Sequence, residues 1–162
     1  MEFPVVAELV RAVEMKDVST AAHTWRVALY AMAMAEAYQI PLDERPRIVR
    51  AAVLHDIGKV DVPDQILQKP GQLTDAEYEQ IKQHTTHGYE RLKRMGERDE
   101  LALALVRSHH ERLDGSGYPD GLIGDDIPQV ASTFAVIDTF DAMTSIRPYR
   151  RRVGRDAARG AI

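Results

Sequence analysis

The sequence predicts an all-α domain, on three observations. Apolar residues recur every three or four positions through most of the 162 residues, which is the period of a helix with one buried face. No segment shows the apolar–polar alternation expected of a half-buried strand. The long irregular stretch at residues 113–128 is rich in Gly, Asp and Pro, and we expect it to be a loop between helices.

The first half of the chain is expected to form three helices. The first covers residues 3–15, where five apolar residues share one face: Val5, Val6, Leu9, Val10 and Val13. Ser19 or Thr20 is expected to cap the second, which continues to about residue 38. The third helix opens near residue 44 and runs into the pair His55-Asp56.

Three further helices are expected in the second half. Thr74 and Glu77 have the spacing of a capping box, which predicts a helix from there through His84 to about residue 95. Another helix covers about residues 99–111. After the irregular stretch, a strongly apolar helix is expected over residues 129–144.

The composition fits one globular domain over residues 1–162. Hydrophobic residues make up 44% of the chain and charged residues 28%. The net charge of −4 argues against a nucleic acid polymer as a partner. No apolar run is long enough to cross a membrane, and the first residues lack the layout of a signal peptide. The absence of cysteine excludes disulfides and thiolate zinc sites and fits a cytoplasmic location.

The histidines are distributed in an informative way. Five of the six form an ordered series with two aspartates: His23, His55-Asp56, His84, His109-His110 and Asp138. Imidazole and carboxylate groups are ligands for divalent transition metals. The residues that come directly before the members of this series on their helices are mostly apolar. These side chains are therefore expected to converge in the interior, as in helical-bundle metal sites.

Seven potential ligands are more than one ion needs, which points to two ions. A single histidine on an apolar helix is more often a hydrogen-bonded core residue than a ligand, but that explanation does not account for the whole ordered set. His87 lies three residues after His84, on a neighbouring helix face, and is left outside the ligand set.

Two strings around these residues resemble a known family. HDIGK at residues 55–59 resembles the HD-domain motif of metal-dependent phosphohydrolases, and HHERLDGSGYP at residues 109–119 resembles the hallmark of the HD-GYP subgroup. Further similar strings are HTWRV at 23–27, ILQKPG at 66–71 and DTFDAMTSIRPYR at 138–150. The resemblance implies an HD-domain-like helical bundle around a buried dimetal site. It also implies hydrolysis of cyclic di-GMP to pGpG, or further to GMP.

The resemblance assigns the metal ligands to the residues already singled out: His23, His55, Asp56, His84, His109, His110 and Asp138. Asp56 matches the carboxylate that bridges two metals. Some members carry a Glu that supports a third ion at the position occupied here by Ser19, so two divalent ions are expected. Iron or manganese is favoured, with zinc, nickel and cobalt as alternatives.

Catalytic and substrate-binding roles are also expected. A pair of ions suits phosphodiester hydrolysis, because it activates a bridging water as hydroxide for attack on phosphorus. Lys59 is expected to bind a phosphate oxygen or assist the leaving group; its alternative is a solvated surface lysine. Asp141 lies one turn after Asp138 and is expected to orient a ligand histidine or the attacking water, the alternative being a surface charge.

A cyclic dinucleotide has phosphates and guanines, which guanidinium groups and aromatic rings recognise. Arg147 and Arg150 match substrate-contacting positions of the family, and Tyr118 is expected to stack on a guanine or to meet a protein partner. The family resemblance suggests a GGDEF-domain protein as partner through the Gly-Tyr-Pro loop, and homodimer formation is a further expectation. The chain shows no sensory or receiver domain, and its C-terminal end looks shortened for the family.

Two other functions remain open at this point. One is hydrolysis of another cyclic dinucleotide, such as cyclic GMP-AMP, or of a nucleotide, because the selectivity for guanine depends on the shape of the pocket. The other is a non-catalytic receptor that binds the dinucleotide and signals by protein contact. The presence of every metal-ligand position argues against the receptor.

Overall fold

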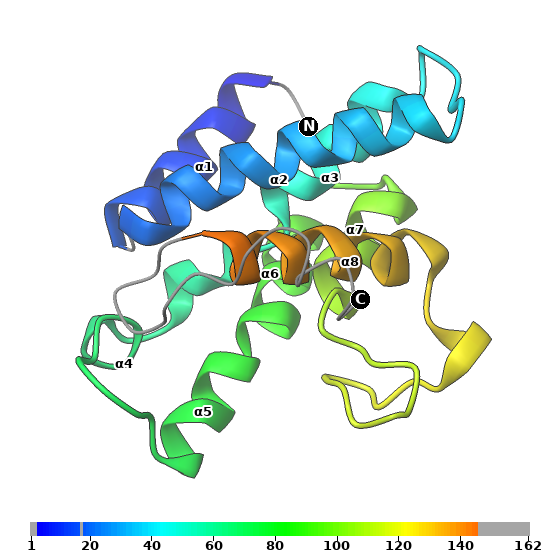
Figure 1. Ribbon diagram of the computed structural model, residues 1–162. Helices are drawn as coiled ribbons and strands as arrows, with labels where there is room; N and C mark the ends of the chain where they lie inside the picture. Colours follow the sequence, from blue (N-terminus) through cyan, green and yellow to red (C-terminus); the bar gives the residue numbers. More distant parts are fainter. Residues whose placement is uncertain (1–2, 17, 146–162) are drawn as a thin grey trace.

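The computed structural model describes the backbone of residues 3–16 and 18–145, and the side chains of residues 5–16 and 22–145. Within these ranges the chain is helical and has no strand, which confirms the all-α prediction; an isolated bridge joins Asp114 and Ile123. The elements are α1 Phe3–Lys16, α2 Val18–Ala37, α3 Arg45–Leu54, the 3-10 helix η1 Ile57–Asp61, α4 Asp64–Leu67, α5 Asp75–Lys82, α6 His84–Arg94, α7 Glu100–Ser108, the 3-10 helix η2 Gly124–Asp126 and α8 Gln129–Thr144 (Figure 1).

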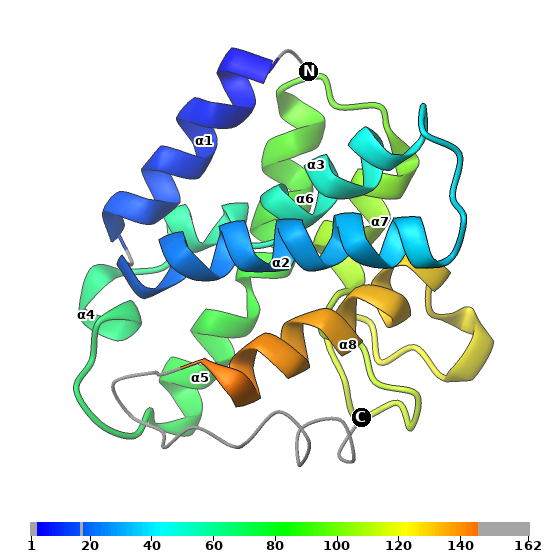
Figure 2. The same cartoon turned by 45° about the horizontal axis from the view of Figure 1, so that its top comes forward.

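The long helix α2 crosses the molecule and packs on α1, α3 and α8 (Figure 2). Helix α3 packs on α7 as well as on α2, while η1 follows α3 in the chain and packs on α6. Helix α5 projects away from this body (Figure 1) and has no buried residue. None of the helices in the described ranges is both long and apolar enough to span a membrane.

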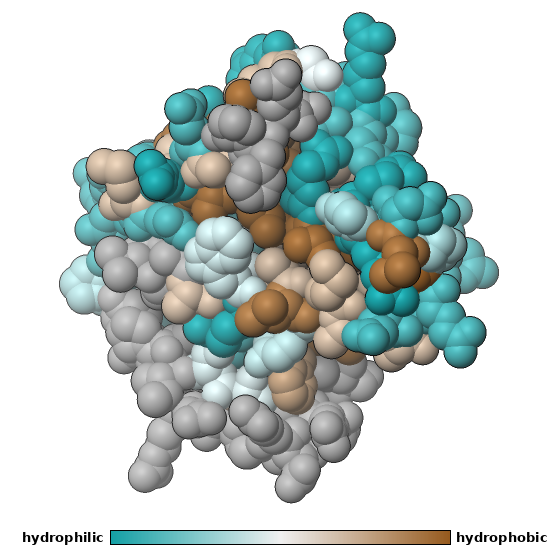
Figure 3. Space-filling model, turned by 90° about the horizontal axis from the view of Figure 1, so that it is seen from above, coloured by the Kyte–Doolittle hydropathy of each residue, from teal (hydrophilic) through white to brown (hydrophobic). Residues whose placement is uncertain are grey.

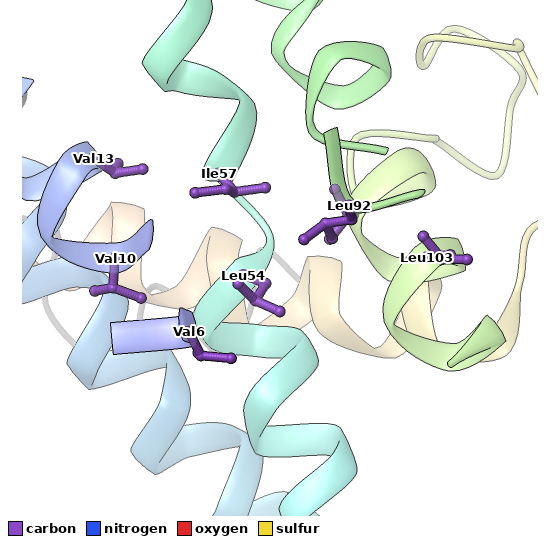
Figure 4. Close-up of a cluster of buried hydrophobic side chains, with 8 residues drawn as sticks. Val6, Val10, Val13, Leu54, Ile57, Leu92 and Leu103 are labelled. Atoms are coloured by element: carbon purple, nitrogen blue, oxygen red, sulfur yellow. The ribbon is translucent and has the colours of Figure 1, made fainter. Parts of the chain in front are cut away.

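Two apolar clusters hold these helices together. The first joins α1 to the end of α3, to η1 and to α6 and α7 (Figure 4); its buried members are Val6, Val10, Val13, Leu54, Ile57, Leu92, Leu103 and Val106. The second joins α2, α3, α7 and α8, and its buried members are Val27, Ala31, Ala51, Ala52, Ala102, Leu105, Phe134 and Ile137. Because half of the second set is alanine, these four helices can approach closely around the end of α3, where His55 and Asp56 are also buried.

The outer face of α2 is apolar as well. Trp25, Leu29 and Met32 are spaced at i, i+4 and i+7 and are 56%, 69% and 39% exposed. Figure 3 views the molecule from the side on which α1 and α2 lie, and apolar atoms gather near the centre of that face. Helix α2 therefore presents apolar side chains both to the core and to the surface.

Three predicted boundaries were wrong. Helix α2 begins at Val18, so the backbone of Ser19 and Thr20 lies inside it and not at its N-cap position. A cap stabilises a helix by only about 1 kcal/mol, which is less than the stabilisation that a long helix gains by packing on its neighbours. The helix predicted over residues 99–111 ends at Ser108, where the ring Nδ1 of His109 faces the carbonyls of Leu105 and Val106.

The helix predicted from Thr74 to about residue 95 is two helices. Its capping box is present, but α5 ends at Lys82 and α6 begins at His84. The hydroxyls of Thr85 and Thr86 donate to the carbonyls of Lys82 and Gln83, which offers the backbone an alternative to a continuous helix. The break lets α6 bury His84 while α5 extends into solvent.

An ionic cluster ties the start of α7 to α3. The carboxylate of Asp99 accepts from Arg47 and Arg50, and Asp99 also caps α7 by accepting from the amide of Leu101 at 3.1 Å. Hydrogen bonds from Arg47 and Arg50 lower the pKa of Asp99 to about 2. Arg50 also pairs with the buried Glu97.

We expect Asp99→Asn to lower the free energy of unfolding by about 1–2 kcal/mol near neutral pH, since asparagine still caps a helix but cannot pair with arginine. The pKa of Asp99 is lower in the folded chain than in the unfolded chain. Its contribution is therefore complete above the unfolded pKa of about 3.9 and is lost as the pH falls through about 2. Urea denaturation of both proteins at several pH values measures this. A difference that stays constant down to pH 2 would contradict it.

Candidate metal centre

The seven predicted ligands meet at the centre of the helices. His23 comes from α2, His84 from α6 and Asp138 from α8, whereas His55, Asp56, His109 and His110 lie at or just beyond helix ends. Their ligand atoms form three compact groups, each within 4.8 Å: His84, His109 and His110; His23, His55 and Asp138; and His55, Asp56 and His109. The first two groups share no residue, so the described chain offers two separate sets of three ligands.

Asp56 lies between these two sets. Its Oδ1 is 3.4 Å from Nε2 of His84, and its Oδ2 is 3.1 Å from Nε2 of His55. Each carboxylate oxygen therefore faces a different histidine group, and the residue is only 4% exposed. A carboxylate in this position could contribute one oxygen to each set.

In four of the five predicted ligand histidines, the ring nitrogen Nδ1 faces an oxygen atom. Nδ1 of His55 and Nδ1 of His84 each lie 2.7 Å from a carbonyl of their own chain segment, that of Ala52 and that of Ile81. An N–H there donates to the carbonyl, which leaves Nε2 as a lone pair. Nε2 of His84 lies 3.2 Å from Nε2 of His109. Two lone pairs at this distance repel unless a cation lies between them, so the donor set fits metal ions.

Burial keeps several of these rings neutral. It lowers the pKa of His84 to about 3 and that of His110 to about 4, and it holds the pKa of His109 well below its usual range. Neutral imidazole is the form that binds a metal. These three histidines are therefore ready to act as ligands over the whole physiological pH range.

Their mutual interaction shifts the pKa values of His55 and Asp56 in opposite directions. Burial disfavours the charge on both, but the carboxylate of Asp56 raises the pKa of His55, and His55 together with Lys59 holds the pKa of Asp56 well below its usual range. Asp56 is therefore an ionised carboxylate in the protein interior, where it needs positive partners. Divalent ions would supply that charge.

Lys59 and Asp141 both lie against this set. Nζ of Lys59 is 2.6 Å from Oδ2 of Asp56, and the side chain is 20% exposed, so its ammonium lies at the border between the ligands and solvent. Asp141 is fully buried, so it is not the surface charge that was its alternative, and its Oδ2 lies 2.8 Å from Nδ1 of His23. The structure thus brings both residues together with the predicted ligands.

The loop after His110 covers one side of the set. The ring of Tyr118 packs against that of His110, with centroids 4.8 Å apart and an angle of 31° between the planes. Nζ of Lys82 lies 5.7 Å from the centre of the Tyr118 ring. Tyr118 thus lies beside the predicted ligands.

Glu111 organises this loop and was missed by sequence reasoning. It is 4% exposed, and its two carboxylate oxygens accept from the amides of Asp120 and Leu122 at 2.7 and 3.0 Å. Gly117 is needed where the loop returns, because a Cβ there would lie 2.3 Å from the amide nitrogen of Arg112. The signal in the sequence was Glu111 itself, directly after the two histidines and before a Gly-rich stretch.

Glu111→Ala should loosen the loop. The amides of Asp120 and Leu122 lose a charged acceptor, at a cost of about 1–3 kcal/mol. We expect faster cleavage of the loop in limited proteolysis, with fragments that begin or end at residues 111–124. An unchanged cleavage rate would show that Glu111 does not hold the loop.

Three predicted residues lie outside what the structure describes. Arg147 and Arg150 are beyond residue 145, and the side chain of Ser19 is not described, although its backbone lies in α2 one turn before His23. The expectations about substrate-binding arginines and about a third ion therefore stay predictions.

The chain matches the family model described as HD domain over residues 8–161. It therefore belongs to the HD-domain family, in agreement with the resemblance of residues 55–59 and with the buried His55-Asp56 pair.

Three relatives indicate the subgroup. The chain is 44% identical over 154 residues to the "Cyclic di-GMP phosphodiesterase response regulator RpfG" of Xanthomonas campestris, covering 94% of this chain and 41% of that protein. It is 46% identical over 138 residues to a "Cyclic di-GMP phosphodiesterase" of Thermotoga maritima, covering 85% and 38%. It is 42% identical over 146 residues to the "3'3'-cGAMP-specific phosphodiesterase 2" of Vibrio cholerae, covering 90% and 28%. The names are consistent with the HD-GYP subgroup, and the chain spans less than half the length of each of these relatives.

Proposed function

We propose that this chain is a metal-dependent phosphodiesterase that opens cyclic di-GMP to pGpG, with GMP as a further product. The observation that carries the proposal is the position of Asp56, whose two oxygens face two separate histidine groups. Such a carboxylate suits a pair of ions that act together on one phosphate. The names of the Xanthomonas and Thermotoga relatives support this substrate.

The proposed cofactor is a pair of divalent transition-metal ions. One set would comprise His23, His55 and Asp138, the other His84, His109 and His110, with Asp56 between them. Bound ions would activate a water and offset the negative charge on the phosphate. The family resemblance favours iron or manganese, and the mixed nitrogen and oxygen ligands also suit the alternatives zinc, nickel or cobalt.

The chain's own residues would bind and orient the substrate. The ammonium of Lys59 reaches the border of the ligand set, where it can bind a phosphate oxygen or stabilise the leaving oxygen. Tyr118 offers a ring beside the ligands for stacking on a guanine. Arg147 and Arg150 are proposed to bind phosphate and base from the segment after α8.

A second candidate substrate is 3'3'-cGAMP, since one of the three relatives named above carries that activity in its name. It differs from cyclic di-GMP in one base, so the same metal chemistry would serve both. A receptor without catalysis is the remaining alternative, and the complete ligand set argues against it.

A turnover assay tests the proposal. The full chain, loaded anaerobically with Mn(II) or Fe(II), is mixed in separate reactions with cyclic di-GMP and with 3'3'-cGAMP, and the products are separated by chromatography. We expect pGpG from the first reaction and its loss with a chelator. Faster turnover of 3'3'-cGAMP would make 3'3'-cGAMP the proposed substrate in place of cyclic di-GMP. Binding of either nucleotide without any product would support the receptor.

The remaining expectations concern the surroundings of the domain. We retain as predictions a cytoplasmic location, a single catalytic domain over residues 1–162 and contact with a GGDEF-domain protein through the loop that carries Tyr118. Homodimer formation is also a prediction, and the exposed apolar residues of α2 would suit it.

A further inference from the structure

One ligand histidine is coupled to an arginine through a buried carboxylate. His23 and Arg26 lie one turn apart on α2, and Asp141 lies on α8. Arg26 donates twice to Asp141, from Nε to Oδ1 at 2.6 Å and from Nη2 to Oδ2 at 2.9 Å. Oδ2 of Asp141 also lies 2.8 Å from Nδ1 of His23. The two helices are thus joined by a chain of charged and polar contacts that ends on a predicted metal ligand.

The other ligand histidines with a described Nδ1 partner are held differently. Nδ1 of His55, Nδ1 of His84 and Nδ1 of His109 face backbone carbonyls three or four residues earlier. These contacts form as soon as the local turn forms. The ring of His23, in contrast, takes its orientation from a side chain of another helix.

This difference makes the two metal positions unequal. A carboxylate behind an imidazole orients the ring and makes its other nitrogen a stronger donor than a carbonyl does. The Asp141 carboxylate is fully buried, where it accepts two hydrogen bonds from Arg26 and lies against the ring of His23. Ser145 donates to its Oδ1 at 3.1 Å. Of these partners, only Arg26 is always a cation.

We propose that Arg26 is a positioning residue for one of the two metal positions. Through Asp141 it holds Nε2 of His23 toward the ion that His55 and Asp138 also bind; Nε2 lies 3.3 Å from Nε2 of His55 and 3.3 Å from Oδ1 of Asp138. The other position takes its ligands from α6 and from the end of α7, so it does not depend on Arg26. This inference rests on the two-metal part of the proposed function and on no particular substrate.

Arg26→Gln tests the inference by metal binding. The number of Mn(II) ions bound and their dissociation constants are measured by equilibrium dialysis for the wild-type chain and the variant. We expect two ions in the wild-type chain. In Arg26→Gln, one ion should keep its affinity and the other should bind about 10–100-fold more weakly. Far-UV circular dichroism should be unchanged.

Two further variants separate positioning from a general loss of an ion pair. Arg47→Gln removes another two-bond pair, in which Arg47 Nε and Nη2 donate to Asp99 at 3.1 and 2.8 Å, and it should bind both ions as the wild type does. Arg26→Lys keeps the charge but not the planar fork and should have an intermediate effect. If Arg26→Gln fails to fold, the dialysis is done with Arg26→Lys, and weaker binding of one ion alone is again the expected result.

Equal weakening of Mn(II) binding at both positions in Arg26→Gln, or no change in binding at either, would overturn the inference. So would a wild-type chain that binds a single ion. Two ions bound without turnover of any cyclic dinucleotide would refute the proposed function instead, and the dialysis result for Arg26 would still be decisive.

Discussion

Replacement of Asp56 by alanine should lower turnover by about 10³-fold or more and should weaken binding at both metal positions. The reason is that its two oxygens face different histidine groups, at 3.4 Å from His84 and 3.1 Å from His55. Loss of one bridging ligand therefore affects both ions, and metal ions contribute several kcal/mol to the stabilisation of such a transition state. Product formation and metal content of the purified variant measure the two effects.

A histidine on one side of the site provides the comparison. His84→Ala should weaken mainly the position shared with His109 and His110, since His84 belongs to that group alone. If Asp56→Ala also lost only one ion, the carboxylate would not bridge. Turnover that survives Asp56→Ala unchanged would exclude the dimetal mechanism.

Gly58→Ala should destabilise the fold by about 3 kcal/mol or more and disturb the metal centre with it. A Cβ at this position would lie 1.8 Å from the carbonyl oxygen of His84 and 2.5 Å from the amide nitrogen of Gly88. Both neighbours are backbone atoms of α6 and cannot rotate away. Helix α6 and η1 would have to separate, and His84 would move from Asp56.

Gly96→Ala is a matched control for this variant. A Cβ at Gly96 would meet nothing within 4 Å, and only its positive φ of 81° makes alanine unfavourable there, at about 1–2 kcal/mol. Urea denaturation should therefore separate the two variants clearly. Equal stability of Gly58→Ala and Gly96→Ala would show that η1 and α6 can move apart at little cost.

Much of the fold was predictable because its signals are local. The last helix was predicted over residues 129–144 and covers Gln129–Thr144, and the capping box of Thr74 and Glu77 is present. The apolar face of the first helix, with Val6, Val10 and Val13, is buried as expected. Each of these features depends on residues within one or two turns of one another.

What could not be predicted depends on contacts between distant parts of the chain. Nothing near Gln83 in the sequence shows that α6 must turn so that His84 reaches Asp56. The ligand residues themselves could be found, because their residue types are unusual and their order resembles a family. The partners behind them could not: Arg26 meets Asp141 across 115 residues, and its charge alone looks like that of any surface arginine.

The proposed reaction requires two ions, and a titration of metal against turnover measures this requirement directly. Chelator-treated chain is given increasing Mn(II), and the rate of pGpG formation from cyclic di-GMP is recorded together with the number of ions bound. We predict little product with one ion per chain and a steep rise as the second binds. Full turnover at one ion per chain, or in the metal-free chain, would contradict the assignment of Asp56 as a bridge between two metals.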